Sequence, residues 1–420
     1  MSERNPPQIL RTLFNVAVAA CHPTRVVPKA LPPRPQGRIV VLGAGKASAA
    51  MAAAVEAAWG TSIEGLVVTR YGHGAHTQAI EVVEAGHPLP DSAGAKAAER
   101  ALALAHTLGP DDTALVLLSG GGSALWSAPI PPITLAEKQT LTRALVLSGA
   151  SIAEINCVRK HLSLIKGGRL AAAAHPARIL TLAISDVPRD DISVLASGPT
   201  IGDATTQNDA KRILANYGIA TPVSVASVLN DPRHESIKPA DPRLAGSEAH
   251  IIARAADALT AANKEATRLG LDVLVLGSDV EGDARQVARK HAEIVRGLVR
   301  PTKPLLLISG GELTVAVKGQ GRGGPNRQYL LALARALDDT SHTWAIACDT
   351  DGIDGSDDTA GAWIAPDTIA RARTAGLDAA AAEQANDAGT FFDTLGVSIV
   401  TGPTRTNVND FRAILVMPAD

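Results

Sequence analysis

Short apolar stretches rich in β-branched residues alternate along this chain with longer, alanine-rich stretches. The apolar stretches predict strands at residues 38–42, 65–70, 114–118, 178–184, 272–276, 304–308, 343–347 and 398–400. The alanine-rich stretches predict helices at 47–59, 94–108, 135–148, 206–217, 250–269, 283–299, 326–337 and 366–375. The strands show no strong polar–apolar alternation, as expected when helices cover both faces of a sheet. The pattern therefore predicts an α/β fold of βαβ units.

The length of 420 residues predicts two domains, because one hydrophobic core usually stops growing at about 250–300 residues. Residues 229–246 are rich in proline, aspartate and lysine and lack a clear period, so they are the candidate linker. We expect an N-terminal Rossmann-like domain at 1–238 and a C-terminal α/β domain at 239–420, each with a mostly parallel sheet flanked by helices. The sequence leaves open that a terminus completes the sheet of the other domain.

The N-terminal residues carry apolar side chains at helical spacing. One face of the predicted helix is formed by Ile9, Leu10, Leu13, Phe14 and Ala17. This pattern indicates an amphipathic helix packed on a domain. A lipoprotein signal ending at Cys21 is the alternative, but its apolar stretch of about nine residues is short for one. No apolar run reaches the length of a membrane span.

Charge and cysteine content narrow the class of protein. The formal net charge is −2, so no overall basic field is available to hold nucleic acid or an anionic membrane. Cys21, Cys157 and Cys348 are widely spaced and odd in number, which is typical of free thiols in a reducing compartment. We therefore expect a cytoplasmic protein.

The first predicted strand runs into a short glycine turn followed by a helix. Gly43 and Gly45 let the backbone approach a phosphate, the helix N-terminus supplies N–H donors, and Lys46 adds a full charge. The turn reads GxGxxS, with Ser48 in the third position, and it is not a Walker A loop. Arg70 ends the next strand, where an NAD enzyme needs an acidic residue, although an arginine suits the 2′-phosphate of NADP.

Two predicted strands end in the same Ser-Gly-Gly sequence. Glycine-rich turns at the carboxyl ends of strands are where ligands bind in open α/β sheets. We therefore predict a pair of anion-facing loops. Their residues are Ser119, Gly120, Gly121, Gly122 and Ser123 in the first half of the chain, and Ser309, Gly310 and Gly311 in the second.

A basic segment at residues 156–169 follows the first of these loops. If it is helical throughout, Arg159, Ser163 and Lys166 share one face. Arginine binds carboxylates with two parallel hydrogen bonds, so this face is a candidate carboxylate site. A solvated basic face is the alternative.

Upstream of this segment, Asp91 is expected to cap a helix, and His87 is either a ligand contact or a loop residue.

Acidic residues follow several predicted strands. Asp186 and Asp190 come after the strand at 178–184, where a carboxylate can hold Mg²⁺ or deprotonate a hydroxyl; a helix cap is the alternative for Asp190. Glu312 and Asp351 are candidate metal ligands in the second half, with a simple turn as the alternative for Asp351.

The second half also supplies loops rich in glycine and hydrogen-bond donors. Arg322 and Arg327 lie in the glycine-rich segment 319–328 that leads into a helix. Phosphoryl transfer depends mainly on positioning and charge neutralisation, so both arginines are candidates to contact a phosphate. Asn407, in the polar loop 401–410, is a further candidate binding residue.

Taken together, these blocks resemble the glycerate 2-kinase (MOFRL) family, some of whose members carry the name hydroxypyruvate reductase. The resemblance runs from about residue 13 to 416, and its most specific blocks are 43–48, 86–91, 118–123, 156–171, 185–200, 309–328 and 349–355. It implies two α/β domains around an interdomain cleft and transfer of the γ-phosphoryl group of ATP to the 2-hydroxyl of D-glycerate. It also implies dependence on Mg²⁺ and a critical lysine at Lys46.

The resemblance further implies an important arginine in the glycine-rich loop of the second domain. A common form of the family pattern reads Gly-Gly-Arg-Asn-Gln-Glu, whereas this chain has Gly-Gly-Pro-Asn-Arg-Gln at residues 323–328. The choice between Arg322 and Arg327 therefore stays open. A family glycine is also replaced by Arg189, beside Asp190.

These observations combine into one hypothesis with two alternatives. Glycerate binds with its carboxylate on Arg159, while Lys46 and one of the two arginines neutralise the transferring phosphoryl group. Asp186 or Asp190 activates the hydroxyl, and the 2-phosphoglycerate product leaves with ADP. An NAD(P)H-dependent hydroxypyruvate reductase is the first alternative, and a non-catalytic sensor is the second. The expected partners are glycerate and a nucleotide; the chain is a monomer or a homodimer.

Overall fold

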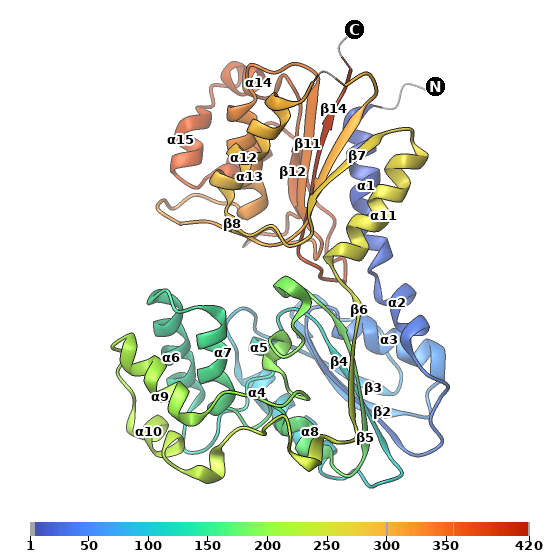
Figure 1. Cartoon of the computed structure of the whole chain (residues 1–420), viewed down its shortest axis with the longest axis vertical. Helices are drawn as coiled ribbons and strands as arrows, with labels where there is room; N and C mark the ends of the chain where they lie inside the picture. Colours follow the sequence, from blue (N-terminus) through green and yellow to red (C-terminus); the bar gives the residue numbers. More distant parts are fainter. Residues whose placement is uncertain (1–4, 300, 356, 419–420) are drawn as a thin grey trace. The chain divides into compact units, whose positions relative to one another are not determined.

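The computed structural model describes residues 5–299, 301–355 and 357–418 of the chain, shown in Figure 1. These residues form two compact units. Residues Pro23–Ile252 make the N-terminal unit. The residues up to His22 and those from Ala253 onward make the C-terminal unit, so its helix α1 comes from the opposite end of the chain.

A six-stranded sheet in the order β3-β2-β1-β4-β5-β6 organises the N-terminal unit. Its strands are β1 Ile39–Ala44, β2 Glu64–Arg70, β3 Ile80–Ala85, β4 Thr113–Leu118, β5 Arg178–Ile184 and β6 Ser247–Ala253. The pairs β3–β2, β2–β1, β1–β4 and β4–β5 are parallel. This strand order is that of the Rossmann fold, in which ligands bind outside the carboxyl ends of β1 and β4, where the order reverses.

The helices of this unit form two groups. The helices of one group pack on the sheet or on a helix that covers it: α2 Pro23–Ala30, α3 Ser48–Trp59, α4 Ser92–Ala105, α5 Gly122–Leu125 and α8 Arg169–Ala174. The other has a small apolar core of its own to one side of the sheet: α6 Leu135–Leu147, α7 Ile152–His161, α9 Gln207–Asn216 and α10 Val223–Leu229 (Figure 1). Short 3₁₀ turns lie at Pro188–Asp190, Leu195–Ser197, Pro232–His234 and Pro242–Leu244.

Side-chain size and capping explain why these elements lie where they do. Every residue of β1 and β4 is buried, and Gly43 allows their close approach, because a Cβ there would lie 2.6 Å from the Leu117 carbonyl oxygen. The Asp91 carboxylate accepts a hydrogen bond from the N–H of Gly94 at 3.0 Å, which confirms its predicted role as the cap of α4.

A second six-stranded sheet, ordered β13-β12-β11-β14-β9-β7, organises the C-terminal unit. Its strands are β7 Asp272–Gly277, β9 Leu305–Ser309, β11 Thr343–Asp349, β12 Gly361–Ile364, β13 Ser398–Ile399 and β14 Asp410–Val416; a separate two-residue pair joins β8 Gly282–Asp283 to β10 Leu313–Thr314. Only β7 and β9 pair in parallel among the described strands of this sheet.

Helices cover both faces of this second sheet. Helices α1 Pro6–Ala20 and α11 Ala255–Arg268 lie together on one face (Figure 1). The other face carries α12 Ala284–Gly297, α13 Pro325–Ala336, α14 Thr368–Thr374, α15 Ala379–Gln384 and α16 Ala388–Thr394. The five apolar residues predicted on one face of the first helix are all buried, which confirms that helix.

The α/β class and the eight predicted strands are confirmed, but among the described residues six further strands were not predicted: β3, β6, β8, β10, β12 and β14. The second sheet also differs from our expectation. It is mixed, not mostly parallel, because β14 lies antiparallel between β9 and β11. We did not predict β14, whose alternating polar residues Asp410 and Arg412 interrupt the apolar pattern although both are buried. The start of the helix predicted at 250–269 is strand β6.

The boundary between the units also lies later than expected. Residues 229–246, our candidate linker, pack on the N-terminal unit: Ile237 is buried, and its N–H donates to the Gly167 carbonyl at 3.2 Å. The chain passes to the C-terminal unit at Ile252–Ala253 instead of at 238–239.

Within the part of the chain that the structure describes, we find no helix with both the length and the apolar composition of a membrane span.

Candidate active site

The turn between β1 and α3 packs tightly against the end of β4. The Lys46 N–H donates to the Gly120 carbonyl at 2.8 Å, and the Ala47 N–H donates to Ser119 Oγ at 2.9 Å. Gly45 has a φ of 143°, and a Cβ there would lie 2.1 Å from Ser119 Oγ. These backbone donors are engaged within the fold, contrary to our expectation of a phosphate cradle. The side chain of Lys46, which is partly buried, supplies the positive charge of this turn.

The turn after β4 is confined by two side chains from other loops. Gly121 adopts a φ of 83°, which favours glycine. A Cβ on Gly121 would lie 3.0 Å from the His87 ring and 3.4 Å from Lys46 Cγ. The structure thus brings Lys46, His87 and the glycine turn together at the sheet edge where the strand order reverses; the sequence analysis had not placed His87 beside the other two.

Ser123, the last residue of this loop, contacts a strained segment after β5. Its Oγ lies 2.7 Å from Ser197 Oγ, which donates to Asn156 Oδ1 at 3.1 Å. Ala196 and Ser197 have φ values of 50° and 61°, a region that costs free energy for residues with a Cβ. Ser197 is a site residue that we did not predict, since its sequence context shows only a turn.

A pocket of about 300 Å³ opens beside Ser123, between α6, α7 and the loop that follows His87. Lys138, Arg159 and Lys166 supply its cationic groups; 5% of Lys138 and 1% of Lys166 are exposed. No aspartate, glutamate or histidine is among the described residues that line it. The remaining lining residues are Pro88, Leu89, Pro90, Ala124, Ser127, Gln139, Thr142, Arg143, Val146 and Leu147.

Burial and mutual repulsion act on all three cations. Burial, aided by the charge of Arg159, lowers the pKa of Lys138 to about 7. Burial and the charges of Lys138 and Arg159 hold the pKa of Lys166 well below its ordinary range, and burial lowers the pKa of Arg159. Lys138 Nζ finds no hydrogen-bond partner among the described residues, and Lys166 Nζ donates only a 3.3 Å bond to the Ala196 carbonyl. The pocket is therefore an incomplete charge arrangement that an anion would complete.

Arg159 and Lys166 share this pocket as predicted, but by a different route. Helix α7 ends at His161, so Lys166 does not continue the helical face of Arg159. The loop after α7 nevertheless stays close to the helix: a Cβ on Gly167, directly after Lys166, would lie 3.3 Å from Lys160 Cβ, and Lys166 lines the same pocket as Arg159. Ser163 leaves the face altogether and pairs with Pro129 in an isolated β-bridge.

Lys138 was not among the predicted site residues. In α6 it occupies the same buried face as Leu141 and Leu145, at spacings of three and four residues. A lysine in register with the apolar positions of a helix is the signal that could have revealed it.

The two acidic candidates of this unit lie just beyond β5. Asp186 is partly buried two residues after the strand ends, and Asp190 lies in the following 3₁₀ turn. Arg189 and Asp190 both have positive φ values, 60° and 56°. Neither aspartate lines the cationic pocket, so the structure places them at the predicted sheet edge but not beside Arg159.

In the C-terminal unit, Arg327 is fully buried and bound to carboxylates. Its Nε donates to Asp354 Oδ2 at 3.0 Å, and its two terminal nitrogens donate to Asp357. Burial raises the pKa of Asp354 to about 6 despite the neighbouring guanidinium. Arg327 therefore holds a loop in place, whereas Arg322 is exposed and pairs with Asp393 at 2.7 Å.

The second Ser-Gly-Gly turn is also packed inside its own unit. Arg412 Nε donates to Ser309 Oγ at 3.2 Å, and Arg412 Nη2 donates to the Gly310 carbonyl. Arg412 in turn pairs with Asp410 at 2.7 Å. Gly311 has a φ of 95°, and a Cβ there would lie 2.3 Å from the Val280 nitrogen. This loop differs from our expectation of an open anion cradle, and Arg412 was not among the predicted site residues.

The candidate metal ligands do not form a cluster. Asp351 is buried and its carboxylate accepts the Ile353 N–H at 2.8 Å, as expected for the turn interpretation. Glu312 is exposed, and Asn407 is buried in its loop, where it accepts the Asn409 N–H at 3.3 Å. Across the described residues, no group of three or more histidine, cysteine, aspartate or glutamate side chains is arranged to hold a metal ion.

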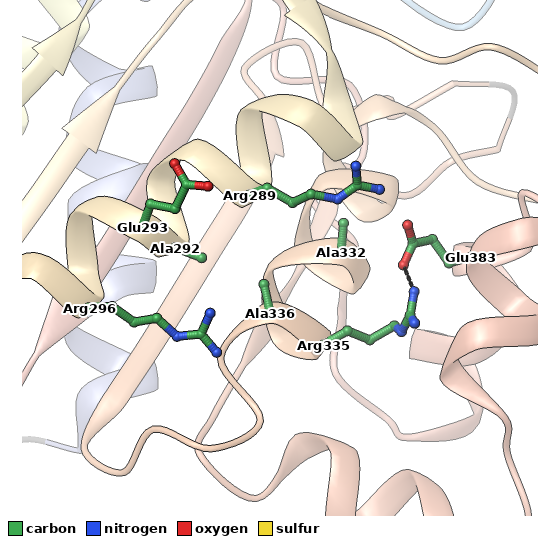
Figure 2. A pocket seen from close by; sticks show the side chains of 8 residues that line it. All are labelled: Arg289, Ala292, Glu293, Arg296, Ala332, Arg335, Ala336 and Glu383. Atoms are coloured by element: carbon green, nitrogen blue, oxygen red, sulfur yellow. Dashed lines mark hydrogen bonds and ion pairs between the residues drawn. The ribbon is translucent and has the colours of Figure 1, made fainter.

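A larger surface hollow on α12 and α13 is a weaker candidate (Figure 2). Arg289, Arg296 and Arg335 point toward it from the two helices. Arg335 pairs with Glu383 and Arg296 pairs with Asp339 at 2.7 Å. The hollow lies on the helical flank, away from the carboxyl ends of the parallel strands, and two of its three arginines already have carboxylate partners.

Comparison with known proteins identifies the family to which this chain belongs. Residues 9–230 match a domain of unknown function, DUF4147, and residues 305–410 match the MOFRL family. The D-glycerate 2-kinase of Thermotoga maritima is 39% identical over 409 residues, which cover 96% of each chain. The chain belongs to the glycerate 2-kinase (MOFRL) family.

Other members of this family carry two kinds of name. The crystal structure of glycerate kinase from Thermotoga maritima superposes with a TM-score of 0.87 at 36% identity, covering 98% of this chain and 99% of that one. A protein of Agrobacterium vitis, provisionally named hydroxypyruvate reductase, is 50% identical over 417 residues, or 97% of this chain and 94% of its own. The glycerate 2-kinase (MOFRL) family thus includes both names that the sequence blocks led us to expect.

Proposed function

We propose that this chain transfers the γ-phosphoryl group of ATP to the 2-hydroxyl of D-glycerate, giving 2-phosphoglycerate and ADP. The observation that carries this proposal is the turn between β1 and α3. Its backbone donors bind Ser119 and Gly120, so the turn offers Lys46 as a charged side chain instead of a row of free N–H groups. A lysine that neutralises developing charge suits phosphoryl transfer.

In this proposal, the cations around Ser123 bind the acceptor and Lys46 contacts the phosphoryl group. Asp186 or Asp190, at the same edge of the sheet, accepts the proton of the attacking hydroxyl. Arg322, exposed on the glycine-rich segment, is the better candidate for a phosphate contact from the C-terminal unit, because Arg327 is held by Asp354 and Asp357.

Magnesium enters this proposal as part of the nucleotide substrate. Mg²⁺ is usually held by substrate phosphates and one or two carboxylates, so a dedicated protein cage is not required. Glu312 and Asp351 remain the candidate carboxylates. The three cysteines are buried and form no disulfide in the described part of the chain, which fits a reducing compartment, and we propose that the enzyme acts in the cytoplasm as a monomer or a homodimer.

Hydroxypyruvate reductase is the competing function, and the name of the Agrobacterium vitis relative favours it. A dinucleotide site needs backbone donors and close access at the first strand-to-helix turn. Here the space in front of Gly45 is filled by Ser119, and the residue at the end of β2 is Arg70 instead of an acid. These features weigh against binding of NADH at this turn. The cationic pocket suits a carboxylate substrate in either reaction.

Two parallel assays test the proposal. We expect the purified protein to release ADP from MgATP only when D-glycerate is present, with phosphorus NMR identifying the 2-phosphate ester. Lys46→Met should lower kcat about 100-fold or more, since removing one charge-stabilising group has effects of this size. Lys96→Met, on the exposed face of α4, is the matched control. The kinase proposal would be overturned if the protein oxidised NADH or NADPH in the presence of hydroxypyruvate and released no ADP from MgATP in the presence of D-glycerate.

A further inference from the structure

The cationic pocket of the N-terminal unit has a composition that is unusual for a protein interior. Lys138, Arg159 and Lys166 line it together with Arg143, and no carboxylate does so among the described residues. Buried lysines are normally paired, because an unpaired buried charge loses its hydration without compensation. The arrangement lowers the stability of the empty protein, so it is better explained by a ligand than by folding.

The charge pattern indicates which anion the pocket takes. A nucleoside triphosphate binds with Mg²⁺, and a site with several cations and no carboxylate repels that ion. The volume of about 300 Å³ is also at the small end of ligand pockets. Its walls include Leu89, Val146 and Leu147, which suit a carbon skeleton more than phosphate oxygens. The pocket therefore fits a small, metal-free carboxylate.

The position of the pocket connects it to the phosphoryl-transfer groups. Ser123 lines the pocket and ends the loop whose Gly121 lies against Lys46 and His87. Pro88, the residue after His87, lines the pocket too. An acid with its carboxylate among the cations can thus direct a neighbouring hydroxyl toward Lys46.

We propose that this pocket is the acid-binding subsite for 2-hydroxy acid acceptors, and that Lys138 completes it and selects acids over neutral alcohols. This inference rests on the proposed function and adds a residue that was not among the predicted site residues. Arg159 provides a permanent charge, and Lys138 and Lys166 add hydrogen-bond donors from two further directions.

Binding of the acid should be linked to uptake of protons. The groups facing Lys138 are Arg143 on its own helix, Arg159 on α7 and Lys166 on the loop behind it, all of them basic. Burial, together with repulsion from Arg159, lowers the pKa of Lys138 and favours a partly neutral lysine in the empty pocket. A bound carboxylate supplies the missing negative charge, raises the pKa of the lysine and draws a proton from solution.

Steady-state kinetics of Lys138→Met test the proposal directly. We expect KM for D-glycerate to rise about 10- to 100-fold, the range for losing one charged hydrogen bond, with KM for MgATP changed less than about twofold. The preference for D-glycerate over glycerol should narrow in the same variant. Lys96→Met is the matched control and should match the wild type in every constant. An unchanged KM for glycerate, or a rise in KM for MgATP instead, would overturn the assignment.

A second variant and a binding measurement separate this inference from the proposed function. Lys138→Arg should keep glycerate binding near pH 7 but take up fewer protons, measured by calorimetry in buffers of different ionisation enthalpy. If the wild type shows no kinase activity, the proposed function fails, and the same calorimetry decides the inference: glycerate binding that takes up protons and weakens in Lys138→Met supports it, and absence of binding contradicts it.

Discussion

Buried cations occur in both units, but their partners differ. In the C-terminal unit, Arg327 contacts Asp354 and Asp357, and Arg412 contacts Asp410. In the N-terminal unit, no carboxylate is among the described residues that line the pocket of the buried Lys138 and Lys166. A buried charge that is already paired holds the fold together, whereas an unpaired one is available to a ligand. This difference directs the search for substrate-binding residues to the N-terminal unit.

The two Ser-Gly-Gly turns show the same contrast at the level of the loop. Ser309 accepts a hydrogen bond from Arg412, a charged group of its own sheet. Ser119 accepts one from the Ala47 N–H, an uncharged backbone donor, which leaves the charge of the adjacent Lys46 outside that bond. Identical sequences at strand ends therefore serve different roles, set by the side chains that fold against them.

The largest effect is expected from removing a paired cation. Arg412→Met leaves Asp410 buried without its guanidinium, and breaking such a pair typically costs about 3–5 kcal/mol. We expect a loss of this size in the free energy of unfolding of the C-terminal unit, measured by urea denaturation. Arg373→Met removes an exposed arginine from its pair with Asp338 and should change stability by less than about 1 kcal/mol. Equal effects of the two variants would show that the buried pair of Arg412 holds the fold no more firmly than an exposed pair, and would contradict the structural role that we assign to buried, paired cations.

Removing an unpaired cation should have the opposite sign. The pKa of Lys138 lies near 7 in the folded protein, below its ordinary value of 10.5, so the unfolded chain binds more protons between these values. Its destabilising contribution is complete below pH 7 and disappears as the pH rises toward 10.5. Lys138→Met should therefore stabilise the empty protein at pH 7 by on the order of 2 kcal/mol.

Thermal unfolding of Lys138→Met at several pH values checks this sign. The gain over the wild type should shrink from pH 7 to pH 10, while Lys96→Met should show no such trend because that lysine is exposed. A variant that is less stable than the wild type at pH 7 would indicate that Lys138 is paired after all.

The smallest effect on stability is expected at Arg322. Its pair with Asp393 is exposed, so Arg322→Gln should change the free energy of unfolding by less than about 1 kcal/mol. If Arg322 contacts the phosphoryl group, kcat/KM for MgATP should nevertheless fall about tenfold or more. Arg327→Lys should behave in the reverse way, losing stability but keeping activity in the molecules that remain folded. Full activity of Arg322→Gln would remove this residue from the site.

Part of the candidate site was accessible to sequence reasoning, because its glycine turns and Lys46 follow strands and because Arg159 and Lys166 belong to one basic segment. The glycine turns, Lys46, Arg159 and Lys166 could be identified from local patterns and from the resemblance to a family. The role of the turn after β1 could not, since its donors are engaged by Ser119 and Gly120, which lie more than seventy residues later in the chain. Ser197 was missed for the same reason, since its contacts Ser123 and Asn156 are distant in sequence. Lys138 was missed although its register with Leu141 and Leu145 in α6 was readable from the sequence.

The sequence alone determined the α/β class, the strand ends that are candidates for ligand binding and the identity of the charged candidates, because these depend on local apolar pattern and on the direction of βαβ units. Only the tertiary structure decided that Arg327 is neutralised by Asp354 and that Lys138 Nζ has no hydrogen-bond partner among the described residues. Whether a charge is paired depends on residues brought together from distant parts of the chain, and it is this pairing that separates a residue that holds the fold from one that can bind a substrate.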